Sequence, residues 1–133
     1  MGRGLKRAVC LGAVICTLAA AVGADPLVGL WASPPDGKGQ TGIVQIKPCG
    51  DAYCGTLIKA FDPNGKQIVT KNVGKRLLWG MKPMGGGLYG EGRVFVPIFG
   101  RDYPAEVTLS GTRMTVKGCA ALVCKAQKWR RAQ

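Results

Sequence analysis

The sequence predicts an all-β domain, and three observations lead to this fold class. Apolar and polar residues alternate with a period of two in several short runs, which is typical of half-buried strands. Glycine and proline interrupt these runs every few residues and indicate tight turns between neighbouring strands. No segment beyond residue 24 shows a convincing amphipathic helical pattern. Seven or eight short antiparallel strands in a domain of this size fit a small closed barrel or a sandwich.

The expected strands follow one another from residue 27 to residue 130. Two of them, 42–47 and 53–60, flank a cysteine loop as a hairpin. The segment 67–70 is a weak strand pattern, and 77–81 is compatible with either a strand or a helical turn. The other expected strands are 27–33, 88–98, 103–110, the run around Met114 and Val116, and 122–130.

Residues 1–24 have the order of a secretory signal peptide. Three basic residues near the start precede an uncharged apolar run over 8–22, and small residues follow it. A membrane anchor is the alternative, but a spanning helix needs about 20 apolar residues and this run is shorter. We therefore expect cleavage after Ala24 and a single domain at 25–133. The protein would be periplasmic or secreted, with no transmembrane anchor after cleavage.

Four cysteines remain after this expected cleavage, because Cys10 and Cys16 lie in the signal peptide. These four form two C-x4-C pairs, each between two strand-like runs. They are Cys49, Cys54, Cys119 and Cys124. An even count in an exported protein indicates disulfides, and four cysteines allow three connectivities. We favour the local pairings 49–54 and 119–124, because each would close a hairpin near its turn and contribute roughly 2 kcal/mol. The chain has no histidine and no C-x2-C spacing, so we expect no metal, no cofactor and no thioredoxin-like chemistry.

Basic residues outnumber acidic ones, with 19 Lys and Arg against 7 Asp and Glu and a net charge of +12. Removal of the signal's three basic residues leaves a net charge of +9. Such a field attracts anionic partners such as phospholipid head groups or lipopolysaccharide. The dense basic group lies near the C-terminus and comprises Lys125, Lys128, Arg130 and Arg131. Because the other charges are spread out, we favour a soluble, self-repelling surface over a dedicated polyanion site.

Motifs at both ends of the expected domain resemble a known bacterial family. The chain has an opening G-x-W at Gly29 and Trp31, a C-G-x-x-x-C-G hairpin at 49–55, and a closing W-x-R at Trp129 and Arg131. This pattern resembles the domain-of-unknown-function family 2147, a family of small exported bacterial proteins. The resemblance covers nearly the whole domain.

The resemblance implies a lipocalin-like, seven- to eight-stranded up-and-down barrel. In such a barrel the G-x-W of the first strand meets an arginine from the last, which carries over to Gly29, Trp31 and Arg131. A guanidinium on the face of a tryptophan contributes about 0.5–2 kcal/mol, and a glycine allows close backbone approach. We group Trp129 with these residues and expect all four to close the barrel, which is a structural role.

Residues suited to catalysis are sparse beyond the signal peptide. There is no histidine, and the serines Ser33 and Ser110 lie outside any nucleophile elbow. The carboxylates are too scattered to form an acid–base pair. The glycine-rich stretch 84–92 lacks the Lys-Ser/Thr and the following helix of a phosphate loop, so we interpret it as a mobile hairpin loop. We therefore expect no catalytic residue and no enzyme.

These observations favour a binding module for a small apolar or amphipathic ligand in the cell envelope. The ligand would lie inside the barrel under a mobile rim at 84–92, although a barrel of eight strands is also narrow enough to be filled by its own side chains. The candidate lining residues are Trp79, Leu88, Tyr89 and Phe95. The alternative is a basic protein that contacts anionic lipid, lipopolysaccharide or another partner through its surface. Export makes nucleic acid an unsuitable partner, so we expect none.

Overall fold

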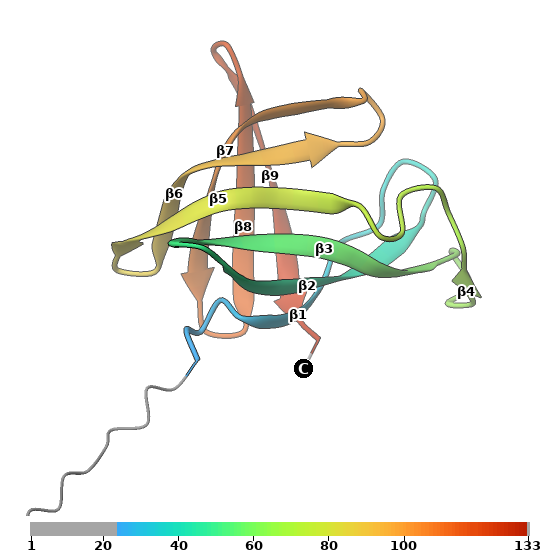
Figure 1. Ribbon diagram of the computed structural model, residues 1–133. Coiled ribbons are helices and arrows are strands. Elements are labelled where there is room, and N and C mark those ends of the chain that lie inside the picture. The colour runs from blue at the N-terminus through green and yellow to red at the C-terminus, as the bar shows by residue number, and fades with distance from the viewer. Residues whose placement is uncertain (1–23, 133) are drawn as a thin grey trace, which may run out of the picture.

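The computed structural model describes residues 24–132, which form nine antiparallel strands (Figure 1). The expected signal peptide therefore lies outside the described residues, apart from Ala24. The strands are β1 (Gly29–Ala32), β2 (Thr41–Cys49), β3 (Ala52–Phe61), β4 (Gln67–Ile68), β5 (Arg76–Gly85), β6 (Leu88–Val96), β7 (Arg101–Ser110), β8 (Arg113–Ala120) and β9 (Val123–Arg131). No helix in this range is long and apolar enough to cross a membrane.

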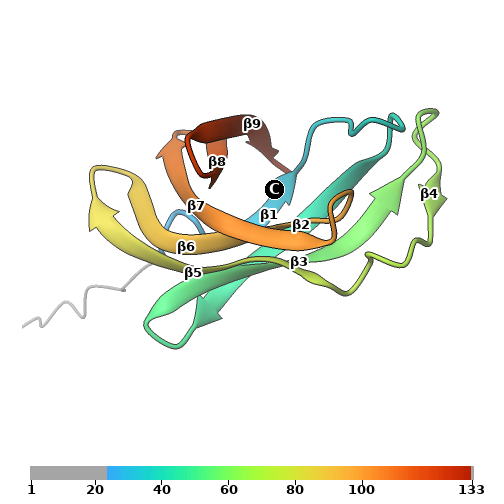
Figure 2. The same ribbon diagram turned by 90° about the horizontal axis from the view of Figure 1, so that it is seen from above.

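Eight of the strands form a closed ring, and β4 is an appendage. Each strand pairs with the next along the chain, except that β5 pairs with β3 and the short β4 lies on the far end of β3. The ring closes where β9 returns to β1 (Figure 2). The prediction of a small antiparallel up-and-down barrel is confirmed, and the sandwich alternative is excluded.

The turns of this meander lie alternately at the two ends of the barrel. We call one end the floor; it carries the turn before β1 and the turns at 50–51, 86–87 and 111–112. We call the other end the rim; it carries the long connections after β1 and β3 and the turns at 97–100 and 121–122. The tip of the β8–β9 hairpin stands at the top of Figure 1, and the connection that carries β4 lies on the right.

The first strand begins later than expected, at Gly29. Asp25 holds the preceding residues in a turn, because its carboxylate accepts the N–H of Leu27 at 2.8 Å and its carbonyl accepts the N–H of Val28 at 2.9 Å. This turn places the side chain of Leu27 inside the barrel, where it is fully buried.

The interpretation of residues 84–92 as a mobile rim loop is wrong. The stretch forms the ends of β5 and β6 with a two-residue turn at Gly86 and Gly87, and it lies at the floor. Gly87 adopts φ +82°, and a Cβ there would lie 2.6 Å from the carbonyl oxygen of Leu109. The glycines permit a tight hairpin that lies against β7; they do not loosen it.

The interior of the barrel towards the floor is filled by side chains. The fully buried side chains come from five of the eight barrel strands and from the turn before β1. They are Leu27, Trp31, Val44, Ile46, Leu78, Met81, Val107 and Met114. This filling agrees with the narrow lumen expected of eight strands.

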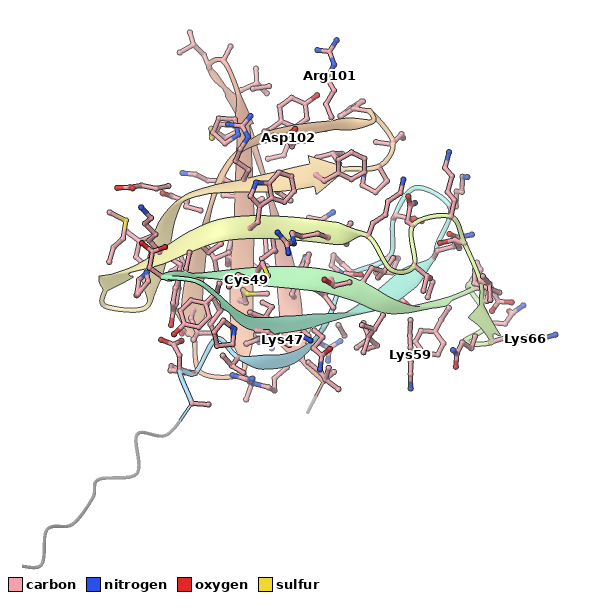
Figure 3. The ribbon with its side chains drawn as sticks, viewed as in Figure 1. Lys47, Cys49, Lys59, Lys66, Arg101 and Asp102 are labelled. Atoms are coloured by element: carbon pink, nitrogen blue, oxygen red, sulfur yellow. A yellow bond between two sulfur atoms is a disulfide. The ribbon has the colours of Figure 1, made fainter. Side chains whose placement is uncertain are left out.

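Both predicted disulfides are confirmed, and one lies at each end of the barrel. Cys119 lies directly opposite Cys124 in the β8–β9 hairpin, with a Cα–Cα distance of 4.0 Å. Cys49, which is labelled in Figure 3, bonds Cys54 across the diagonal of the β2–β3 hairpin, because Cys49 lies opposite Ala52. The cysteines therefore fasten two hairpins.

Candidate functional site

Barrel closure at the floor centres on Trp31 and Arg131. These residues face each other across β1 and β9, and the guanidinium carbon lies 4.2 Å from the centroid of the indole ring. The same guanidinium donates hydrogen bonds to the carbonyl oxygens of Val28, at 2.9 Å, and Pro26. One side chain thus joins the last strand to the first strand and to the turn before it.

Gly29 leaves the space that Arg131 needs. A Cβ on Gly29 would lie 2.6 Å from Nη1 of Arg131, and the backbone there has φ +136°. The indole of Trp31 is fixed in turn, because its Nε1–H donates to the carbonyl of Leu27 at 2.9 Å. Trp129 is also buried, opposite Met114, and its Nε1–H donates to the side chain of Gln127 at 3.1 Å.

A polar contact between Asp25 and Tyr89 completes the floor. The phenol of Tyr89 donates to the Asp25 carboxylate, and its ring packs edge-on against Tyr53 with centroids 5.9 Å apart. Burial raises the pKa of Tyr89 well above its usual range, and the hydrogen bond to Asp25 raises it further. Burial and the Asp25 charge also raise the pKa of Tyr53. Both phenols are therefore neutral donors across the physiological range and are unsuited to act as bases.

The four side chains expected to line a ligand cavity do not surround one. Tyr89 is buried in the core, whereas Trp79, Leu88 and Phe95 belong neither to the core nor to the half-buried apolar side chains that pack against it. Tyr89 and Val94 are both core-facing although five positions separate them, because Glu91 (φ +61°) adds a bulge to β6 between Tyr89 and Gly92.

The bulge in β6 explains why the expected lining was incorrect. In a regular strand Tyr89 and Phe95 would share a face, but the extra residue places Phe95 on the outside, where the ammonium of Lys75 lies 5.4 Å from its ring. A similar irregularity at Gly80, which has φ +68°, lets Leu78 and Met81 both face the core and leaves Trp79 outside.

The candidate binding site lies at the seam between β9 and β1. The two strands pair only at Trp31–Arg131 and Ala32–Arg130, and towards the rim they separate. The gap forms a groove of about 500 Å³, within the range typical of small-ligand sites. Its lining comes from the end of β1, the segment after it, the start of β2 and the end of β9, and comprises Ala32, Ser33, Pro34, Pro35, Thr41, Lys128, Arg130 and Arg131.

The groove carries positive charge without a balancing carboxylate. No Asp or Glu is among the lining residues, and the guanidinium of Arg131 is engaged at the floor. The ion pairs among residues 24–132 are Lys82–Glu91, Arg93–Asp102 and Lys117–Glu106, so neither Lys128 nor Arg130 belongs to one. The basic side of the groove comes from the C-terminal group of basic residues that the sequence already showed. The opposite wall at Pro34 and Pro35 was missed by the sequence analysis, although two consecutive prolines after a strand indicate that strand pairing ends there.

A second depression, of about 320 Å³, lies on β6, β7 and β8. Its two carboxylates, Glu91 and Glu106, are 63% and 43% exposed and lie 3.8 and 3.5 Å from the ammonium groups of Lys82 and Lys117. Exposed, paired carboxylates are ordinary surface charges, and they do not form the water-shielded acid–base pair that hydrolysis needs. Within the described range no three His, Cys, Asp or Glu side chains gather as a metal site.

Comparisons with known proteins agree with this architecture. Residues 29–131 match the family of uncharacterized proteins conserved in bacteria, DUF2147, and the chain belongs to that family. Among solved structures, protein HP1028 from the human pathogen Helicobacter pylori, which belongs to the lipocalin family, is similar with a TM-score of 0.64 and 14% identity. The similarity covers 80% of this chain and 83% of that protein, and it shows the fold alone. No curated protein matches the sequence significantly.

We predict that Gly29→Ala destabilises the domain by about 2–3 kcal/mol, because the new methyl group meets Arg131 and the backbone conformation disfavours any side chain. Urea unfolding with the disulfides intact measures this. Gly37→Ala is the matched control, since no atom lies within 4 Å of its Cβ position, and it should change stability by less than about 0.5 kcal/mol. Equal effects of the two substitutions would contradict the role given to Gly29.

We predict that Tyr89→Phe costs about 1–2 kcal/mol near pH 7, because the hydrogen bond to Asp25 is lost. It should also flatten the loss of stability in alkali. Since the folded pKa of Tyr89 lies above its usual value of 10.0, the folded state binds more protons than the unfolded chain above about pH 10, and stability falls there as pH rises. Urea unfolding at about pH 7, 9 and 11 tests both points. The same alkaline slope in wild type and variant would refute this account of Tyr89.

Proposed function

We propose that this chain is a non-enzymatic exported binding protein of the cell envelope, which holds a small amphipathic anion in the seam groove. Its membership of DUF2147 and its lipocalin-like barrel are compatible with such a role. The observation that carries this proposal is the groove itself, where an apolar wall at Pro34 and Pro35 faces Lys128 and Arg130. Such a site suits a ligand with an apolar body and an anionic head.

The filled interior argues for the groove as the binding position. The buried side chains at the floor include large residues such as Trp31, Met81 and Trp129, and burial of a ligand among them would require their displacement. In the groove, by contrast, the apolar body of a ligand would lie against Ala32 and the prolines, and the hydroxyl of Thr41 offers a polar contact. The head would meet two cations that no carboxylate neutralises.

The proposed location rests on the disulfides together with the signal-like start of the sequence. Disulfides persist in oxidising compartments, and both pairs here fasten hairpins of the folded domain. A periplasmic or secreted protein would meet fatty acids and lipid breakdown products, which have the chemistry that the groove suits.

A second candidate function is contact with an anionic lipid surface through the rim. Two rim turns expose large apolar side chains: Ile98 is 81%, Phe99 61% and Leu122 99% exposed. Together with the positive net charge, these turns are suited to rest on phospholipid or lipopolysaccharide. Binding to vesicles rich in phosphatidylglycerol that is lost in Phe99→Ser and Leu122→Ser would favour this candidate over the groove.

We predict that the protein binds dansyl-undecanoic acid, and that Lys128→Gln with Arg130→Gln weakens this binding about tenfold, because two cations facing the carboxylate are removed. The matched control is Lys59→Gln with Lys66→Gln, which removes the same charge from exposed positions on β3 and beside β4 (Figure 3). Fluorescence titration should give this control an affinity within about twofold of wild type. The methyl ester of the same probe should bind weakly to all three proteins.

Two results would contradict the proposal. Absence of any binding by the wild-type protein would show that the groove is not a fatty-acid site. Equal weakening in both double variants would show that net charge, and not the groove, attracts the probe.

A further inference from the structure

The edge of β9 that faces away from β8 is largely unpaired. β9 pairs with β8 from Val123 to Arg130, whereas β1 pairs with β9 only at Arg130 and Arg131. All side chains of β9 from Val123 to Lys128 are exposed, which agrees with a missing neighbour on this side. The barrel is therefore closed at the floor and open along β9 towards the rim.

The direction of the backbone groups along this edge follows from two hydrogen bonds. The N–H of Arg131 donates towards the β8 side, to the carbonyl of Thr112 at 2.8 Å, and the N–H of Ala132 donates towards β1, to the carbonyl of Leu30 at 2.8 Å. Alternate residues of a strand point their backbone groups to opposite neighbours. Even-numbered residues of β9 therefore direct their N–H and C=O away from β8.

The β8–β9 disulfide supports the same assignment. Cys119 and Cys124 lie opposite each other with Cα atoms 4.0 Å apart, a spacing typical of the closely spaced pairs that exchange no backbone hydrogen bonds. The backbone groups of Cys124, Ala126 and Lys128 therefore point to the open side, where no strand of the described chain pairs with them. These three residues form a free strand edge of three donors and three acceptors.

The sequence after β1 explains why this edge is left free. β1 ends at Ala32, and Pro34 and Pro35 follow, so the chain lacks two of the N–H groups that a longer β1 would need for pairing. The chain then turns towards β2, and the seam groove separates it from β9. The position that a longer β1 would occupy is open to another extended segment.

We infer that this edge binds an extended acidic segment of a partner protein, which adds to the barrel as a strand beside β9. Backbone pairing with Cys124, Ala126 and Lys128 would supply affinity, and carboxylates along one face of the added segment would lie beside Lys128. A second copy of this chain is a poorer occupant, because pairing of two β9 edges brings the lysines of one copy near those of the other. Lysines on an edge strand oppose self-association in this way, and they attract an acidic strand.

The test uses a capped, fluorescently labelled peptide of alternating glutamate and valine, Glu-Val-Glu-Val-Glu-Val-Glu, with fluorescence anisotropy as the readout. We expect it to bind wild-type protein and to bind Ala126→Pro at least about tenfold more weakly. Proline at this position removes a donor of the free edge and none of the donors that face β8. Ala126→Val keeps the N–H with a side chain of similar size and should bind within about twofold of wild type.

A second set of measurements keeps the inference testable if Ala126→Pro fails to fold. The same peptide, N-methylated at two consecutive central residues, presents an incomplete set of donors on either edge and should lose binding to wild-type protein. The matching lysine–valine peptide should also fail to bind. If the N-methylated peptide or the lysine peptide bound as tightly as the glutamate peptide, the inference would be overturned. It would also be overturned if sedimentation analysis showed a dimer of the wild-type protein that Ala126→Pro abolishes.

This inference and the groove proposal fail separately. Ala126 does not line the groove, so a folded Ala126→Pro protein should bind dansyl-undecanoic acid as wild type does. Arg130→Gln should affect the groove and spare the free edge of β9, because Arg130 lines the groove and its backbone is already paired with Ala32. It should weaken the fatty-acid probe more than it weakens the peptide.

Discussion

The contact between Trp31 and Arg131 is the constraint on which the rest of the barrel depends. Only two residue pairs connect the last strand to the first, and in one of them a guanidinium covers the face of an indole. The cation–π contact and the hydrogen bonds to Val28 and Pro26 act in the same small region. Gly29 is required there because any larger residue would occupy the position of the guanidinium.

Closure at the floor determines what the interior contains. Leu27 is held inside by the turn at Asp25, and the carboxylate that shapes this turn also accepts the phenol of Tyr89. Apolar filling and a half-buried polar contact therefore occupy the end where the strands are most completely paired. The interior has a structural role there, and the binding that we propose takes place on the surfaces where the ring is incomplete.

The groove and the free edge of β9 lie side by side at the seam and have the same structural cause. Because Pro34 and Pro35 end the pairing of β1, they create an apolar wall opposite the basic end of β9 and leave the β9 backbone without a neighbour. The groove offers shape and charge to a small ligand, and the edge offers hydrogen bonds to an extended chain. Lys128 belongs to both, so a change of charge at this position should affect both proposed kinds of binding.

The sequence alone indicated the all-β class and the succession of most strands, and it favoured the two local disulfides. These properties are local: a period of two, frequent turn residues and cysteines five positions apart need no knowledge of distant contacts. The contact between Trp31 and Arg131 was anticipated through the family's end motifs, because a residue pair 100 positions apart leaves no local pattern. The basic residues of the groove were likewise visible as the dense group at the C-terminal end.

Only the tertiary structure decided which side chains face the interior and where the barrel is open. The bulges at Gly80 and Glu91 each shift the alternation by one residue, so Trp79 and Phe95 lie outside although a regular pattern allows them inside. The glycine-rich stretch became a tight hairpin because the approach of Leu109 to Gly87 fixes it. The groove depends on the distance between two segments far apart in the sequence, and that distance is set by barrel closure, which no local pattern encodes.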